Sequence, residues 1–165
     1  MKRFFLAAAF LLHAICAHAV DSVSAEVGGG THGVHLWRVG VQWVPHPEWL
    51  AERRWDYYWD VSFGNWHSDT GTTHDFGVTP VFRYARHARG WYFDGGVGAH
   101  VVSESHVSSD LGFSTHFQFG NHLGVGYNFG GFSVSGRFQH LSNAGMRNPN
   151  PGINFLQLRV QYPLR

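Results

Sequence analysis

The sequence predicts an all-β fold, an eight-stranded antiparallel transmembrane β-barrel of the bacterial outer membrane. Three observations support this prediction. Apolar and polar residues alternate along most of the chain, 16% of the 165 residues are aromatic, and no lysine follows Lys2. Aromatic, glycine-containing and lysine-poor segments favour strands over helices. Alternation with period two places one class of side chain on each face of a sheet.

Residues 1–19 are expected to be a signal peptide. The chain opens with two positive charges, continues with an apolar segment at 4–16, and then has Ala17-His18-Ala19, which fits a cleavage site. The apolar segment is too short to span a bilayer. We therefore expect residues 20–165 to form a single β-barrel domain after export, in the cell outer membrane.

The charge and histidine content argue against two kinds of site. Without Lys2 and Arg3, ten arginines face eleven acidic residues, so the mature chain is close to neutral. A nucleic-acid-binding surface needs a basic excess, so we expect no nucleic acid as a partner. The thirteen histidines share no spacing with acidic residues or cysteine that marks a metal site. We expect no metal ion.

Eight segments carry the alternation, and an even number of strands allows the sheet to close. They are residues 23–29, 37–43, 55–63, 75–84, 91–101, 116–129, 132–142 and 156–164. The last is the clearest, because Leu156, Leu158 and Val160 oppose Gln157 and Arg159. Pro80 falls inside the fourth segment and cannot donate a ladder hydrogen bond, which predicts a β-bulge there.

The apolar face of these strands is expected to meet lipid, and the polar face to fill a narrow lumen. Charged residues of the polar face should pair there as a buried network. The expected members are Arg38, Asp56, Asp60, Arg83, Asp94, Arg137 and Arg159. Tryptophans should form aromatic girdles at the membrane interfaces. These are Trp37, Trp43, Trp55, Trp59, Trp66 and Trp91.

The connections between strands should alternate in length, with short periplasmic turns and longer outer loops. Short turns are expected at 86–90 and 128–131, and longer polar loops at 65–73, 103–114 and 144–152. The segment 45–54 is an exception, because it falls on the inner side yet is long. We expect a short helical turn in it.

The seventh segment carries chemistry on its lipid-facing side. Phe132, Val134, Gly136 and Phe138 point outward, and His140 and Ser142 continue the same series. Side chains at i and i+2 of a strand lie about 7 Å apart, which allows a Ser–His hydrogen bond if the strand twists. A nucleophile at the outer end of this strand would meet the acyl ester of an outer-leaflet lipid from the side.

This part of the chain resembles the active-site segment of the lipid A 3-O-deacylases, the PagL family. The resemblance rests on His140-Leu141-Ser142-Asn143-Ala144-Gly145 and on Asn148-Pro149-Asn150-Pro151-Gly152-Ile153. It implies an eight-stranded outer-membrane barrel that hydrolyses the 3-O-linked acyl chain of lipid A (lipopolysaccharide) in the outer leaflet. It also implies that no cofactor is needed.

The resemblance further implies the roles of individual residues. Ser142 would be the nucleophile and His140 the general base. The family's acid, a Glu, corresponds to Asn154, and no Asp or Glu follows Asp110 in this chain. An amide oxygen can still accept from the imidazole and fix its tautomer, although it supplies no charge. Asn143, Gly145 and Asn150 are the candidates for the oxyanion hole.

Two other functions fit parts of the pattern. A non-catalytic barrel, structural or adhesive, explains the alternation but not an outward His140 and Ser142. A soluble lipocalin-like binder would instead turn Phe76, Val97 and Leu158 inward. The sequence leaves open whether the chain forms a homodimer.

Overall fold

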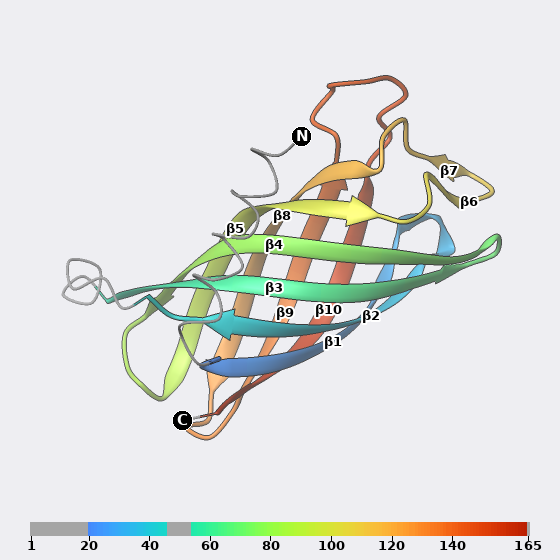
Figure 1. Cartoon of the computed structure of the whole chain (residues 1–165). Helices are drawn as coiled ribbons and strands as arrows, with labels where there is room; N and C mark the ends of the chain where they lie inside the picture. The colour runs from blue at the N-terminus through green and yellow to red at the C-terminus, as the bar shows by residue number, and fades with distance from the viewer. Residues whose placement is uncertain (1–19, 46–53, 165) are drawn as a thin grey trace.

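The computed structural model describes residues 20–45 and 54–164. Eight strands form one closed antiparallel barrel in the order β1-β10-β9-β8-β5-β4-β3-β2 (Figure 1). The wall strands are β1 (Ser22–Gly30), β2 (His35–Trp43), β3 (Trp55–Ser68), β4 (Gly71–Ala85), β5 (Gly90–Val102), β8 (Phe117–Asn128), β9 (Ser133–Ser142) and β10 (Ile153–Pro163). The predicted all-β class and strand number are confirmed. The predicted signal peptide, and the helical turn expected in 45–54, fall largely outside the described residues.

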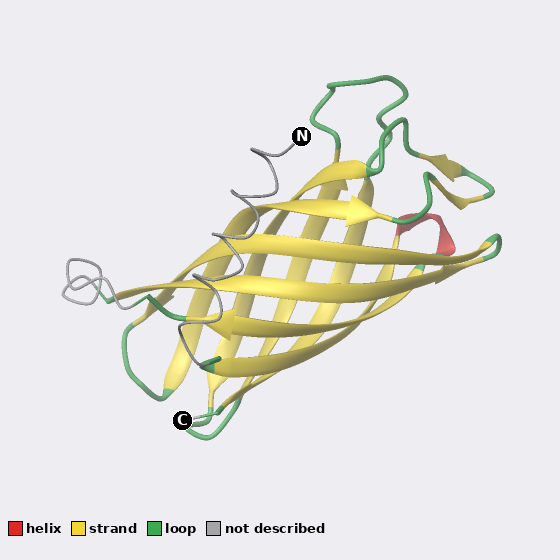
Figure 2. Cartoon of the chain, viewed as in Figure 1, coloured by secondary structure: helices red, strands yellow, loops and turns green. Residues whose placement is uncertain are grey.

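Three smaller elements lie at the end of the barrel that carries the longer loops. A single 3₁₀ turn, η1 (Thr31–Gly33), joins β1 to β2 (Figure 2). A short hairpin of β6 (His106–Ser108) and β7 (Leu111–Gly112) lies in the β5–β8 connection. Over the two described ranges, no helix is long and apolar enough to cross a bilayer. We call this end the outer end, following the rule that outer loops are the longer ones.

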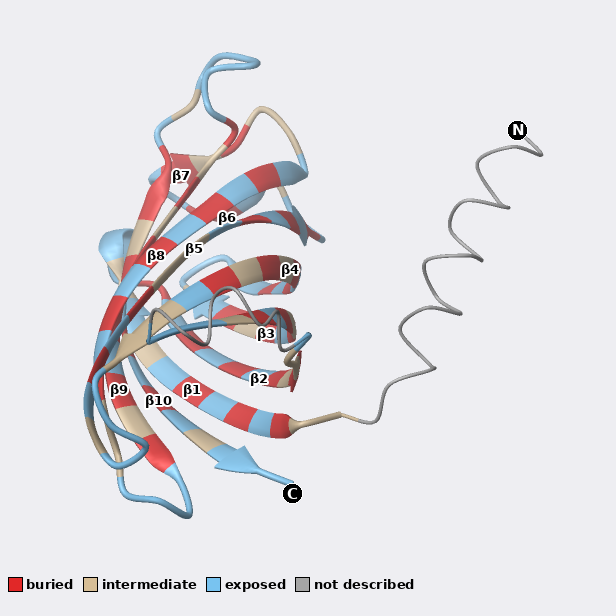
Figure 3. Cartoon of the chain, turned by 90° about the vertical axis from the view of Figure 1, so that its left-hand side faces the viewer, coloured by how far each residue is buried: buried red, intermediate tan, exposed pale blue. Residues whose placement is uncertain are grey.

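Exposed and buried residues alternate along every wall strand (Figure 3). The exposed ones are largely apolar, with Phe76 51%, Val97 62% and Leu158 53% exposed. An apolar exterior around a polar interior is the pattern of a barrel in lipid. The lipocalin-like arrangement is therefore wrong for this chain, because it requires these three side chains in the lumen.

The lumen is filled by arginines and carboxylates that pair with one another. Arg159 lies 2.6 Å from Glu26 and 2.5 Å from Asp60. Arg137 and Arg83 both contact Asp94. Arg38 contacts Asp75, which also accepts from His100. Burying charges without partners would be very costly, so mutual pairing allows this polar interior.

Two members of the predicted sets were placed wrongly. Asp56 is exposed and takes no part in the lumen network, whereas Glu26 and Asp75 belong to it. Asp56 lies one residue from the end of β3, where the interior opens to water. Trp66 is not in a girdle but is 1% exposed, because it continues the inward parity of Asp60 along β3.

The backbone differs from the predictions at two places in β4 and its surroundings. No bulge occurs at Pro80: the β4–β5 ladder skips Thr79 and Pro80, but Val78 pairs with Ala99 and Val81 with Gly96 without a shift of register. Gly96 has no side chain where it faces the carbonyl of Pro80, so the strands can stay in register. The loop expected at 65–73 is largely strand, because β3 and β4 continue to a tight turn.

A buried apolar cluster closes the lumen at the outer end, and we call it the outer plug. Its members are Val34, Leu36, Trp66, Val102, Val107, Leu111, Phe113, Leu141, Ile153 and Phe155. The rings of Trp66 and Phe155 lie 5.1 Å apart at its centre. The plug joins the outer ends of β9 and β10 to the β6–β7 loop, so it fixes the strand ends that carry the predicted site.

The lumen network predicts a large effect from losing one cation. Arg159→Met should lower the free energy of unfolding by roughly 3–5 kcal/mol. The buried network loses one cation, and of their ion pairs Glu26 and Asp60 keep only the longer ones, with Arg38 and Arg137. The measurement is the urea midpoint in detergent micelles, followed by tryptophan fluorescence. Asp56→Asn is the control and should change stability by less than about 0.5 kcal/mol. Equal effects of the two substitutions would contradict this account of the lumen.

Candidate active site

The outer ends of β9 and β10 turn the predicted site residues toward the lipid-facing wall. On β9, Leu141 is 0% exposed in the outer plug, and it lies between the half-buried His140 and Ser142. On β10, Ile153 and Phe155 are buried in the same plug on either side of Asn154. Because successive side chains of a strand point to opposite faces, the inward apolar residues hold their polar neighbours outward.

His140 and Asn154 are direct neighbours across the β9–β10 ladder. The imidazole Nδ1 lies 2.8 Å from Oδ1 of Asn154. An amide oxygen only accepts, so Nδ1 carries the proton and donates it to Asn154. The other ring nitrogen, Nε2, then keeps its lone pair, as a general base requires. The backbone N–H of Asn154 donates to Thr31 Oγ1 at 3.3 Å, which ties β10 to η1.

The structure places Ser142 beside this pair but not in a hydrogen bond with it. Within residues 20–45 and 54–164, the Ser142 hydroxyl has no hydrogen-bond partner. Ser142 pairs with Phe119 of β8 in the ladder, at the last position of β9. Contacts between a nucleophile and its base are often loose without substrate and tighten when substrate binds. A hydroxyl that is free to rotate is compatible with that behaviour.

The loop from 143 to 152 is organised around the side chain of Asn143, which is 0% exposed. Its Nδ2 donates to Ser114 Oγ at 2.8 Å and to the Arg147 carbonyl at 2.7 Å. Its Oδ1 accepts from the N–H of Gly145 at 2.9 Å. The sequence did not indicate Ser114, which comes from the β5–β8 loop and joins that loop to the candidate site.

The three predicted oxyanion-hole residues differ in what they have left to donate. The N–H of Asn143 donates to Oδ1 of Asn150 at 2.9 Å, and the N–H of Gly145 is bound to Asn143. Asn150 is the one of the three with donors left, since neither its backbone N–H nor its side-chain NH₂ has an acceptor among the described residues. Asn150 is half-buried, and its amide orientation is fixed by the bond from Asn143.

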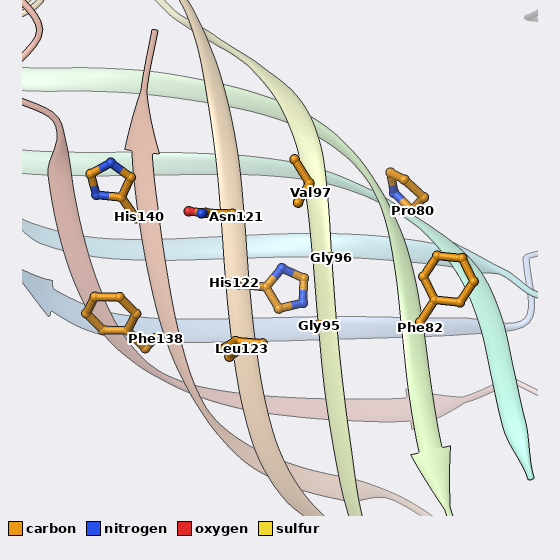
Figure 4. A pocket seen from close by; sticks show the side chains of 10 residues that line it. All are labelled: Pro80, Phe82, Gly95, Gly96, Val97, Asn121, His122, Leu123, Phe138 and His140. Carbon is orange, nitrogen blue, oxygen red and sulfur yellow. The ribbon is translucent and has the colours of Figure 1, made fainter. Parts of the chain in front are cut away.

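A groove of about 680 Å³ lies on the outside of the barrel beside His140, and we call it the external groove (Figure 4). Its lining is mainly apolar and comes from β4, β5, β8 and β9. The residues are Pro80, Phe82, Gly95, Gly96, Val97, Asn121, His122, Leu123, Phe138 and His140. Gly95 adds no side chain to it, and a Cβ built there would meet Leu123 at 3.0 Å. No local sequence pattern indicates the groove, because its four strands are brought together only by barrel closure.

Asn121 is a polar residue on the lipid-facing wall, and it was not among the predicted site residues. It is the β8 neighbour of His140 in the ladder, opposite the side on which Asn154 lies. It is exposed, and it follows the outward parity of Phe117 and Phe119. That parity is a signal from which it could have been found. In the described part of the chain, no group of three or more His, Cys, Asp or Glu residues has the arrangement of a metal site.

Known proteins are similar to this chain in both sequence and fold. The family model for lipid A 3-O-deacylase (PagL) matches residues 35–163. A lipid A deacylase PagL of Pseudomonas aeruginosa is 33% identical over 96% of this chain and 95% of its own. A PagL of Bordetella bronchiseptica is 38% identical over 50% of this chain and 46% of its own.

The comparison of structures agrees. The crystal structure of the outer membrane enzyme PagL has a TM-score of 0.77 and 28% identity, covering 87% of this chain and 99% of that one. The match of the family model includes both strand ends and the loop that carry His140, Ser142 and Asn154. The chain therefore belongs to the lipid A 3-O-deacylase family, PagL.

Proposed function

We propose that this protein hydrolyses the 3-O-linked acyl ester of lipid A in the outer leaflet, with Ser142 as nucleophile and His140 as general base. The observation that carries the proposal is the bond from His140 Nδ1 to Asn154 Oδ1, 2.8 Å long, on the lipid-facing wall beside Ser142. The bond prepares Nε2 to accept a proton. Membership of the family and the names of its relatives support the choice of lipid A as substrate.

The proposed reaction has two steps. His140 Nε2 removes the Ser142 hydroxyl proton while Oγ attacks the ester carbonyl. In the tetrahedral intermediate the bond to the sugar's 3-oxygen breaks, this oxygen takes that proton from the imidazolium to become a hydroxyl, and an acyl-serine remains. Water, deprotonated by the same imidazole, then attacks the acyl-serine. The bond to Ser142 Oγ breaks, Oγ takes the proton back from the imidazolium, and the fatty acid is released. Asn154 holds the proton of neutral His140 on Nδ1 but adds no negative charge to stabilise the imidazolium.

Asn150 is the proposed donor to the oxyanion. A charge that develops on the carbonyl oxygen needs a fixed donor that is not already engaged. The bond from the Asn143 N–H to Asn150 Oδ1 leaves Nδ2 of Asn150 for this task. In this proposal Asn143 and Gly145 shape the loop, because their N–H groups are used inside it.

The external groove supplies a place for the substrate's hydrocarbon. It opens on the lipid-facing wall, is mainly apolar, and reaches His140 (Figure 4). An acyl chain in the groove would have its ester at the outer rim, near the sugar headgroup. Because the substrate is itself a membrane lipid, it can arrive by lateral movement along the wall.

Ser142→Ala tests the proposal directly. We expect the deacylation rate to fall at least about a thousandfold, because the nucleophile is lost. Mass spectrometry of lipid A from cells that express wild type or variant gives the readout. Lipid A should lose one acyl chain only with the wild type. Ser109→Ala, in the exposed β6–β7 turn, is the control and should act as wild type. Full activity in Ser142→Ala, with normal heat-modifiable barrel mobility on gels, would refute the mechanism.

The role of Asn154 is tested by removing its acceptor oxygen and, separately, by replacing its amide with a charged carboxylate. Asn154→Leu should lower kcat by roughly 10- to 100-fold, because Nδ1 loses the acceptor that fixes the tautomer. Asn154→Glu should raise kcat modestly, since a carboxylate stabilises the imidazolium. Rates are measured on purified lipid A in detergent. An unchanged or lower rate in Asn154→Glu, or a normal rate in Asn154→Leu, would count against Asn154 as the orienting residue.

Asn150→Asp separates the proposed oxyanion role from loop structure. The carboxylate can still accept from the Asn143 N–H, but the Nδ2 donor is gone. We expect kcat to fall by about 100- to 1000-fold, with KM changed little. Asn150→Ala should lose both contacts. If Asn150→Asp keeps the wild-type kcat, then Asn150 serves only to hold the loop.

A further inference from the structure

Gly152 differs from other glycines that have positive φ in this chain. It is the last loop residue before β10 and has φ +67, a region that most L-residues avoid. Gly33, Gly130 and Gly145 also have positive φ, but a Cβ built on any of them meets nothing within 4 Å. At those three positions only the backbone conformation favours glycine, whereas at Gly152 the space for a side chain is limiting as well.

The atom that a side chain at Gly152 would strike belongs to His140. A Cβ built there lies 2.7 Å from Cε1 and 3.2 Å from Nε2 of the imidazole. It also lies 3.1 Å from the carbonyl oxygen of Leu141, which is part of the β9 backbone. The imidazole therefore rests directly on the Cα of Gly152, with no room for a methyl group between them.

The imidazole is thus held at two edges by one short stretch of chain. Asn154 binds Nδ1 at 2.8 Å, and Gly152 supports the edge formed by Cε1 and Nε2. Ile153, between them, is 0% exposed in the outer plug. A buried residue cannot shift without cost, so both contacts are fixed relative to the barrel. Nε2 is the nitrogen that the proposed mechanism needs for the Ser142 proton.

We propose that Gly152 is a positioning residue for the deacylation reaction, which acts through His140 by having no side chain. The inference rests on the proposed role of His140 as base. A methyl group at 152 would push the ring from its place, so that Nδ1 leaves Asn154 or Nε2 turns from the nucleophile. Gly152 does not line the external groove, so lipid binding should be spared.

The test compares Gly152→Ala with Gly130→Ala, whose backbone also has a positive φ, +95, but in open space at the other end of the barrel. Gly152→Ala should lower kcat by about 100-fold, the cost of misplacing a catalytic group by roughly 1 Å, with KM within about twofold. Labelling of Ser142 by a fluorophosphonate probe, which needs no lipid substrate, should slow by the same factor. Gly130→Ala should leave both rates within about twofold of wild type.

A second variant separates the ring contact from backbone strain. Asn tolerates positive φ better than most residues, yet its Cβ would meet His140 as Ala does, so Gly152→Asn should be as slow as Gly152→Ala. Recovery of wild-type kcat in Gly152→Asn, or equal rates in Gly152→Ala and Gly130→Ala, would overturn the inference. Folding is checked by heat-modifiable mobility, and Gly152→Asn carries the test if Gly152→Ala does not fold.

The proposed function can be judged separately with His140→Ala. A wild-type rate in His140→Ala would refute the base itself and, with it, the role of Gly152. An inactive His140→Ala together with a fully active Gly152→Ala would refute only the positioning role.

Discussion

The constraint on which this structure depends is that backbone polar groups and charged side chains need partners inside hydrocarbon. Backbone N–H and C=O groups meet this by closing the sheet, since an open edge in lipid would leave them unpaired. Side chains meet it by alternation, which sends apolar residues to the lipid and polar residues to the lumen. Charges in the lumen then need each other. Arg159 bridges Glu26 and Asp60, and Arg137 and Arg83 share Asp94, so the interior is held by ion pairs rather than by apolar contact.

The same alternation becomes a positioning device at the outer end, where the inward residues turn apolar. Leu141 and Ile153 are fully buried in the outer plug, one on each of two paired strands. Each stands next to polar residues that must then face the membrane, and the ladder places His140 opposite Asn154. The candidate site needs no helix or separate domain. Its geometry follows from the barrel's own register, with one loop added through Asn143 and Ser114.

How much of this could be predicted depends on whether the interaction is local. Period-two parity predicted eight strands and the outward face of His140, whereas the partnership with Asn154 came from the resemblance to the PagL family. It would also have placed Trp66 inward, but that residue was assigned to a girdle by its type alone. Asp56 has inward parity yet lies at a strand end, where water replaces the lumen. The bond between Asn143 and Ser114 joins loops 29 residues apart, and the external groove needs four strands in place. No local pattern contains either.

The filled lumen also determines how a lipid can reach the site. The outer plug closes one end, and a void lined by Glu26, Arg38 and their neighbours measures only about 10 Å³, enough for one water molecule at most. A lipid cannot pass through such an interior. The candidate nucleophile and base lie instead on the wall that hydrocarbon already covers, with the apolar external groove beside them. For an outer-membrane enzyme of this family, the bilayer therefore serves as both solvent and substrate store. Because the site lies on the lipid-facing wall, a lipid need not be extracted into water to reach it.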